Sequence, residues 1–230
     1  MENFRGGLLT KSASAYEYLR RLATDGRLRP NRRLSPPDLA TELQVSQTPV
    51  RDALARLAAE GFISGRNGRG FFTKAYTVEE QRDLAQLLFA LGMTALVSAR
   101  ERGKLVPKST LDRLDAAARG DLAAQAAAAE FVEALDALIS EFGAASGNAA
   151  LPVLLQNLLD RTHYVRMLEA RDAVHRVSRA TVMRALVDAV AADNLTGAIV
   201  LMRNHVAQLE ARLGLLVGEA NLAAAALKFP

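Results

Sequence analysis

A short stretch, SQTPVR at residues 46–51, places hydrogen-bonding side chains at the start of an expected helix. Pro49 suits a first helical turn, because the N–H group that proline lacks needs no intrahelical partner there. Apolar residues recur at helical spacing from Val50 onward, so they face inward and leave the polar ones exposed. The polar residues are Ser46, Gln47, Thr48 and Arg51. Hydroxyl and backbone N–H groups at a helix N-terminus bind phosphate, and arginine matches the major-groove edge of guanine.

A basic loop lies between two short apolar runs, FISG at 62–65 and GFFT at 70–73. Runs of this kind around glycine predict a β-hairpin. The tip of the hairpin holds Arg66, Asn67, Gly68 and Arg69. Glycine allows another backbone to approach closely. The two arginines either contact a nucleic-acid backbone or minor groove, or remain solvated, and the sequence leaves both readings open.

Positive charge is concentrated in the first third of the chain. Residues 1–75 hold 13 Lys and Arg against 7 Asp and Glu, a net charge of +6, whereas residues 76–230 hold 16 against 18. A basic segment joined to a near-neutral one suggests a polyanionic partner for the basic segment alone.

The composition excludes several classes of protein. The chain has no cysteine, so it has neither disulfides nor thiolate chemistry. It also lacks a glycine-rich phosphate loop and an H-E-x-x-H motif, and we therefore expect no enzyme. The N-terminus has no apolar run typical of a signal peptide, and no stretch approaches the roughly 20 apolar residues of a membrane span. We expect a cytoplasmic protein without membrane association.

Three helices are expected before the hairpin. Their N-caps are Ser12 or Ser14 for the first, Ser35 for the second, and Ser46 or Thr48 for the third. Gly61 ends the third helix. The order of helix, helix, tight turn, helix and hairpin is that of a winged helix-turn-helix, in which the third helix enters the major groove of DNA.

The stretch GRLRPNRRLSPPDLATELQVSQTPVRDALARLAAEGFI…RGFF resembles the DNA-binding head of the GntR family of bacterial transcription regulators. The resemblance implies that Thr48, Arg51 and Gly68 contact DNA. Two positions depart from the family pattern: Asn31 replaces a glycine, and Gln47 replaces an arginine that commonly contacts the operator. Since glutamine prefers adenine and arginine prefers guanine, the operator is expected to differ from the family's usual bases.

Residues 76–230 are predicted to form an antiparallel bundle of about six helices. The expected helices cover 77–101, 107–120, 121–147, 148–168, 178–194 and 196–216. No convincing strand follows residue 75. The chain is therefore predicted to be mainly α, with a winged helix-turn-helix domain at 1–75 and an all-helical domain at 76–230.

The bundle resembles the FCD effector domain of the FadR subgroup, through GDLAAQAAAAEF, the GN at 147–148 and LVDAVAADNLTGAIVLMRNH. Many FCD domains bind a divalent metal through an Asp and three His, and the metal helps to hold a small carboxylate. Here those positions fall on Leu135, Ile139 and Met183, and only His205 remains. Asp136 is adjacent to Leu135, so a shift of register would restore one ligand.

The resemblance thus implies an effector pocket but no metal and no cofactor. The pocket residues are Leu88, Leu135, Ile139, Met183 and His205. We expect the pocket to be apolar, with His205 as its one polar group. It either holds an apolar ligand, such as a fatty acyl or aromatic compound, or is closed by its own side chains. His205 is either a core residue or a hydrogen-bond donor to that ligand, and His163 and His175 are expected to be ordinary histidines.

The function expected from these features is that of a homodimeric transcription regulator, a repressor that binds a palindromic operator in double-stranded DNA. A small, rather apolar effector would release it. The alternative is a helical interaction and dimerisation protein that docks on DNA without sequence specificity and has no effector.

Overall fold

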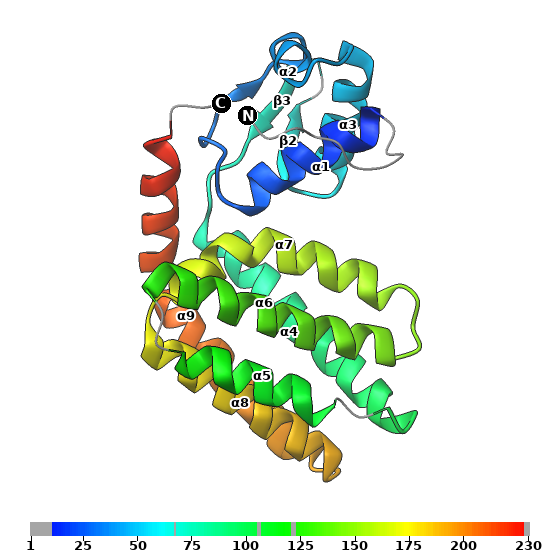
Figure 1. Ribbon diagram of the computed structural model, residues 1–230, viewed down its shortest axis with the longest axis vertical. Helices are drawn as coiled ribbons and strands as arrows, with labels where there is room; N and C mark the ends of the chain where they lie inside the picture. The colour runs from blue at the N-terminus through cyan, green and yellow to red at the C-terminus, as the bar shows by residue number, and fades with distance from the viewer. Residues whose placement is uncertain (1–10, 67, 105–106, 121–122, 228–230) are drawn as a thin grey trace. The chain divides into compact units, whose positions relative to one another are not determined.

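The computed structural model of the chain describes residues 11–227, except 67, 105–106 and 121–122 (Figure 1). The chain divides into two compact units with a break between Ala75 and Tyr76, and the second unit extends to Ala220. The first unit contains α1 (Lys11–Thr24), β1 (Arg33–Leu34), α2 (Pro36–Leu43), α3 (Gln47–Ala59), β2 (Ile63–Arg66) and β3 (Gly70–Thr73). The helices that follow are α4 (Val78–Glu101), α5 (Lys108–Arg119), α6 (Ala124–Ala145), α7 (Leu151–Glu169), α8 (Ala173–Ala191) and α9 (Leu195–Ala225). The expected mainly α fold is confirmed.

The core of the first unit lies where α1 packs against α3. Leu19 of α1 and Val50, Leu54 and Leu57 of α3 are fully buried there. The spacing of the α3 residues is the one that predicted an inward face, so the opposite face of α3 is left to solvent. The core thereby fixes which side chains the first turn of α3 presents.

Two of the helix starts in this unit follow from local sequence. The Ser35 hydroxyl accepts a hydrogen bond from the Asp38 N–H at 3.5 Å, and Pro36 occupies the first turn of α2. Pro49 likewise lies in the first turn of α3. The start of α1 differs from expectation, because Lys11 is already helical and neither Ser12 nor Ser14 is an N-cap.

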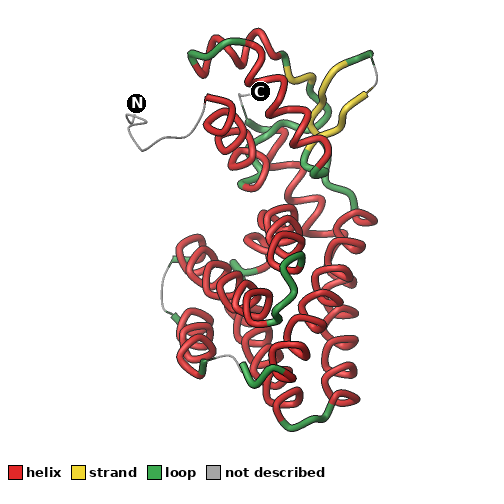
Figure 2. Tube along the Cα trace, turned by 90° about the vertical axis from the view of Figure 1, so that its right-hand side faces the viewer, coloured by secondary structure: helices red, strands yellow, loops and turns green. Residues whose placement is uncertain are grey.

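The wing is a three-stranded antiparallel sheet in the order β1-β3-β2, rather than the expected two-stranded hairpin. Arg66 is opposite Gly70 in the hairpin, and Figure 2 shows β2 and β3 reaching away from the helices of this unit. The additional strand pairs Arg33 with Phe72. Two residues carry too short a pattern to predict a strand, and β1 forms because β3 offers it a free edge.

The backbone conformation of Asn31 explains why asparagine can replace the family's glycine at this position. Its φ of 58° lies in the left-handed region, which glycine adopts freely and asparagine tolerates better than most residues. The chain can therefore make the same turn before β1 with asparagine where the family has glycine.

The second unit is a bundle whose helices pack around one large apolar core. Leu96 of α4, Phe131, Leu135 and Leu138 of α6, and Leu159 of α7 are among its most deeply buried residues. The six expected body helices are all present, although α8 begins earlier and α9 ends later than predicted. Asp172 caps α8 by accepting a hydrogen bond from the Val174 N–H at 2.8 Å.

One helix in the described part of the chain, α4, is long and apolar enough to cross a membrane by length and composition alone. From the sequence we expected no such stretch. Leu84, Leu88 and Leu96 of α4 are buried in the core of the bundle, and this burial accounts for part of the apolar character of the helix.

Candidate nucleic-acid interface and bundle interior

The N-terminal turns of α3 present a compact set of polar side chains to solvent. Gln47, Thr48 and Arg51 are all exposed, and Ser46 directly precedes the helix. The structure therefore brings together the four residues at the start of α3 that were predicted to bind DNA. A hydroxyl, an amide and a guanidinium within one and a half turns provide donors for phosphate and for base edges.

The N-cap of α3 is not closed by its own side chain. Ser46 has extended backbone angles typical of an N-cap, but its hydroxyl accepts no capping hydrogen bond. Ser46 is therefore the N-cap residue, one of the two that the sequence predicted, but it caps the helix without the expected side-chain hydrogen bond. The N–H groups of the first helical turn consequently remain available to an external anion, which the helix dipole also favours.

Of the two arginines at the tip of the wing, Arg66 is held in place by a contact with an aromatic ring. The Arg66 guanidinium lies 4.7 Å from the centroid of the Phe72 ring, and the Arg69 N–H donates to the Arg66 carbonyl oxygen at 2.9 Å. Gly68 has φ of 71°, and a Cβ atom built there would meet no heavy atom within 4 Å. Arg69 and Gly68 are thus the open side of the tip. Asn67, also expected at this site, lies outside the described residues.

A hollow of about 360 Å³ opens between β1, the start of α2, α3 and β3. Its lining includes Arg33 of β1, Arg51 of α3 and the backbone of Gly70, where a Cβ atom would lie 3.6 Å from the Arg33 Nε atom. Arg33 was not among the DNA-binding residues predicted from the sequence. The basic run at residues 27–33 could have indicated a DNA contact by Arg33. Only the pairing of β1 with β3, however, brings Arg33 beside Arg51.

Four of the five expected pocket residues meet inside the bundle. Leu88, Leu135, Ile139 and Met183 line one cavity of about 30 Å³. His205 does not line this cavity. Its ring packs edge-on against Phe89, with the centroids 5.2 Å apart, and Phe89 does line the cavity.

The residues at the family's metal position do not fit a divalent cation. Leu135 and Ile139 have no ligating atom, and Met183 offers only a thioether, a poor ligand for a hard cation. Burial, with a contribution from the positive charge of Arg179, lowers the pKa of His205 to about 3. A guanidinium near the one remaining imidazole would repel a cation. No group of three His, Cys, Asp or Glu side chains suited to a metal occurs among the described residues.

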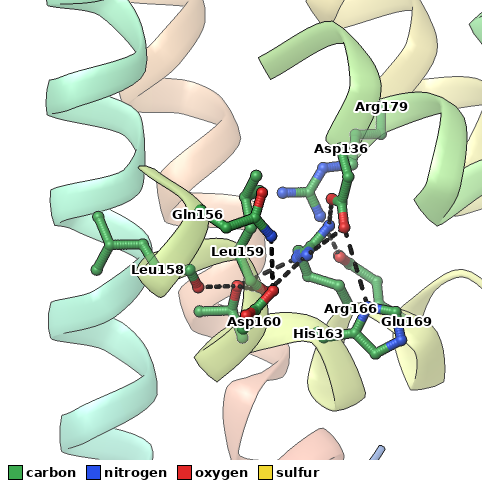
Figure 3. A network of polar contacts seen from close by, with 10 residues as sticks. Asp136, Gln156, Leu158, Leu159, Asp160, His163, Arg166, Glu169 and Arg179 are labelled. Atoms are coloured by element: carbon green, nitrogen blue, oxygen red, sulfur yellow. Dashed lines mark hydrogen bonds and ion pairs between the residues drawn. The ribbon is translucent and has the colours of Figure 1, made fainter. Parts of the chain in front are cut away.

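The expectation that the pocket is apolar apart from His205 is wrong, because charged side chains are buried in the interior of the bundle (Figure 3). Arg166 forms a two-pronged ion pair with Asp136, in which Nη2 lies 3.1 Å from Oδ2. Burial raises the pKa of Asp136, but Arg166 and His163 outweigh it and hold this pKa below its usual value. Arg179 also lines the cavity between Leu135 and Met183.

Glu169 is a second carboxylate of the interior, and it is buried, whereas Asp136 is partly exposed. Its Oε2 atom accepts from Arg179 at 2.6 Å, and its Oε1 atom accepts from Arg212 at 3.1 Å. These pairs could not be predicted from the sequence, because polar residues on the helices expected at 148–168 and 178–194 read as surface positions. In each of these pairs the arginine and its acidic partner lie on different helices.

Two family models match the chain. Residues 11–73 match the family described as "Bacterial regulatory proteins, gntR family", and residues 83–208 match the FCD domain. The "Nta operon transcriptional regulator" of Aminobacter aminovorans is 36% identical over 81 residues, which are 35% of this chain and 39% of that protein. The "Uncharacterized HTH-type transcriptional regulator BphR" of Paraburkholderia xenovorans LB400 is 34% identical over 83 residues, 36% of this chain and 34% of that protein. The chain thus matches little more than a third of the length of each relative.

Solved structures share the fold over most of the chain. E. coli McbR/YncC has a TM-score of 0.63 at 20% identity, with 90% of this chain and 98% of that chain covered. A GntR regulator from Rhodococcus sp. RHA1 has a TM-score of 0.61 at 23% identity, with 89% and 98% covered. These likenesses establish the fold.

Proposed function

Because the chain belongs to the GntR family of bacterial regulatory proteins and carries an FCD domain, we propose that it is a dimeric repressor that binds a palindromic operator. The transcription-regulator class comes from the family. Repression, the operator and the dimer are our proposals. A two-fold symmetric pair of recognition helices would read two half-sites about one helical turn, or a multiple of it, apart.

The observation that carries the proposal is the exposed N-terminal turn of α3. Gln47, Thr48 and Arg51 are held outward there by the buried residues of the same helix. With α3 in the major groove, the Arg51 fork would donate to guanine, the Gln47 amide would pair with adenine, and Thr48 would contact phosphate. The open N-cap at Ser46 supports phosphate binding at the same place.

The wing and the hollow would add contacts to the DNA backbone. Gly68 and Arg69 would follow the minor groove, while Arg66 lies over Phe72 and would contact a phosphate from the side of the wing. Arg33 would reach a phosphate near Arg51. Contacts of this kind position the protein but do not select bases, so they affect all sequences alike.

The second domain would bind a small effector that alters operator binding, without a metal or another cofactor. The absence of ligating side chains at positions 135 and 139 supports this proposal. We also propose that the protein is cytoplasmic. Elemental analysis of the purified protein is expected to find no stoichiometric divalent metal, and one metal ion per chain would contradict the metal-free site.

Selection of binding sites from random double-stranded DNA tests the main proposal. We expect a two-fold symmetric consensus and a footprint that covers both half-sites. The alternative, a helical protein that docks on DNA without specificity, predicts no enriched consensus. Enrichment of a site without two-fold symmetry would contradict the dimeric mode of binding but leave the family assignment intact.

A further inference from the structure

The outward face of α3 carries one negative charge among the side chains proposed to contact DNA. Asp52 directly follows Arg51 and lies about one helical turn after Thr48. All three residues are exposed. The Asp52 carboxylate therefore belongs to the proposed DNA-binding surface, although residues 1–75 as a whole have a net charge of +6.

No contact within the described part of the chain accounts for this carboxylate. The cation one turn further along α3 is Arg56, and its Nε atom donates to the Glu60 Oε1 atom at 2.9 Å. The Arg56 guanidinium also lies 3.7 Å from the centroid of the Tyr16 ring, so it is turned toward α1. Among the described residues, no side chain forms an ion pair or a hydrogen bond with the Asp52 carboxylate.

Asp52 also lies too far along α3 to stabilise the start of the helix. The helix begins at Gln47, which places Asp52 in its second turn. An acidic residue interacts favourably with the helix dipole only within the first turn, and the N-cap position belongs to Ser46. Neither an ion pair nor a helix terminus therefore explains an aspartate at this position, and its side chain is available to a ligand.

The chemistry of a carboxylate limits what it can face on DNA. Phosphate oxygens repel it, and a carboxylate accepts hydrogen bonds but donates none. The donors on base edges in the major groove are the N4 amino group of cytosine and the N6 amino group of adenine. Adenine presents the N7 acceptor beside its amino group, whereas cytosine presents a donor alone. Cytosine is therefore the base that an aspartate matches best.

The neighbouring side chains allow the short aspartate to reach a base. Ala55 and Ala59 follow Asp52 on the exposed side of α3. The major groove is wide enough to admit an α-helix, and methyl groups at these two positions let the helix surface approach the base edges closely. An aspartate carries its carboxylate on a single methylene group, so a close approach is what this contact requires.

We propose that Asp52 is a specificity-determining residue that accepts a hydrogen bond from the N4 amino group of a cytosine in each half-site. This cytosine belongs to a base pair next to the one that Arg51 contacts, because consecutive Cα atoms lie about 3.8 Å apart and stacked base pairs about 3.4 Å. The carboxylate also disfavours guanine and thymine, whose edges would place an acceptor against an acceptor. This inference rests on the proposed function, since it requires α3 to lie in the major groove.

Binding-site selection from random double-stranded DNA, carried out with the full-length wild-type protein and with Asp52→Asn, tests the proposal. Asparagine has nearly the same shape as aspartate, but its amide pairs with the N6 and N7 atoms of adenine. We expect the enriched base at one position of each half-site to change from cytosine to adenine. The wild-type protein should bind the cytosine operator about tenfold more tightly than the adenine operator, and the variant should reverse this order.

Two further variants separate a base contact from a general effect of charge. Asp52→Ala keeps α3, because alanine is the best helix former, and it should lose the preference for cytosine without gaining another base. Glu17→Gln is the matched control, since it removes one negative charge from an exposed position on α1 of the same unit. We expect this control to leave the selected consensus unchanged.

The outcomes distinguish this inference from the function on which it rests. If the wild-type protein enriches no consensus, the proposed function itself fails. If the wild-type protein enriches a consensus that both Asp52 variants retain, only the role of Asp52 is overturned. Equally stronger binding of the Asp52 variants to every sequence, with an unchanged consensus, would place the carboxylate opposite a phosphate and likewise overturn it. A wild-type preference for a base other than cytosine at the affected position would overturn the cytosine contact.

Discussion

Glu169 and Arg179 form an ion pair in the interior of the bundle, with the Arg179 Nη1 atom 2.6 Å from the Glu169 Oε2 atom and both side chains less than 10% exposed. The two residues lie on different helices, α7 and α8, so the pair joins them through the core. Burial lowers the pKa of Arg179, although the charge of Glu169 opposes this effect. The ion pair sets the electrostatic character of the proposed effector site.

Removal of one partner of this ion pair should destabilise the domain more than replacement of both partners by apolar residues. Glu169→Gln leaves two arginines facing a neutral amide, and we expect a loss of about 3–5 kcal/mol in the free energy of unfolding. Arg179→Met combined with Glu169→Met exchanges the pair for apolar groups, and should cost much less. Thermal or urea unfolding of both variants checks the order. A double variant less stable than Glu169→Gln would contradict it.

Arg51→Ala should weaken operator binding by about 1–3 kcal/mol and relax discrimination at one base pair, because the guanidinium fork is expected to read guanine. Affinity is measured for the selected operator and for its single-base variants. Arg113→Ala is the control, since it removes the same charge from an exposed pair with Glu133 in the bundle. If affinity and discrimination both survive in Arg51→Ala, α3 does not read DNA in the proposed register.

Gln47→Arg should shift the preferred base at the facing position from adenine toward guanine, because arginine pairs with the O6 and N7 acceptors of guanine. The selection from random DNA is repeated with the variant and the two consensus sequences are compared. An unchanged consensus would show that residue 47 does not face a base.

Arg33→Ala and Arg69→Ala should each weaken binding to all DNA sequences to a similar extent. Each is expected to contact a phosphate, so the dependence of log affinity on log salt concentration should fall by about one unit per variant. Binding is measured over a salt series with specific and random duplexes. A loss confined to the specific duplex would instead assign that arginine to a base.

His205 should make the fold sensitive to acid. Its pKa falls from 6.5 to about 3 because of burial and the nearby Arg179, so the unfolded chain binds a proton that the folded chain does not. Stability is therefore lost as the pH falls below 6.5, and the folded state should be about 2 kcal/mol less stable at pH 5 than at pH 7.5.

Unfolding of the wild-type protein and of His205→Leu at these two pH values checks the prediction. The leucine variant should lose most of the difference. Asp136, whose pKa is held below its usual value, loses its contribution only in stronger acid and does not interfere in this range. An equal loss of stability in both proteins would assign the acid sensitivity to other groups.

Much of the DNA-binding head was determined by the sequence alone, because its signals are local. A proline in a first helical turn, the inward spacing of Val50, Leu54 and Leu57, and a glycine-bounded hairpin each act within a few residues. The outward position of Gln47, Thr48 and Arg51 followed directly from that pattern. The six body helices were predictable for the same reason, although their ends shifted by several residues.

The features decided only by tertiary structure depend on partners far away in the sequence. Arg33 joins the candidate interface because β1 pairs with β3, about 40 residues later. Arg166 is buried beside Asp136, a residue 30 positions earlier. Helical periodicity reads an arginine as a surface residue, since burying its charge without a partner is costly. Only the packing of α6, α7 and α8 supplies the acidic partners, and among the described residues that packing leaves Arg176 without one.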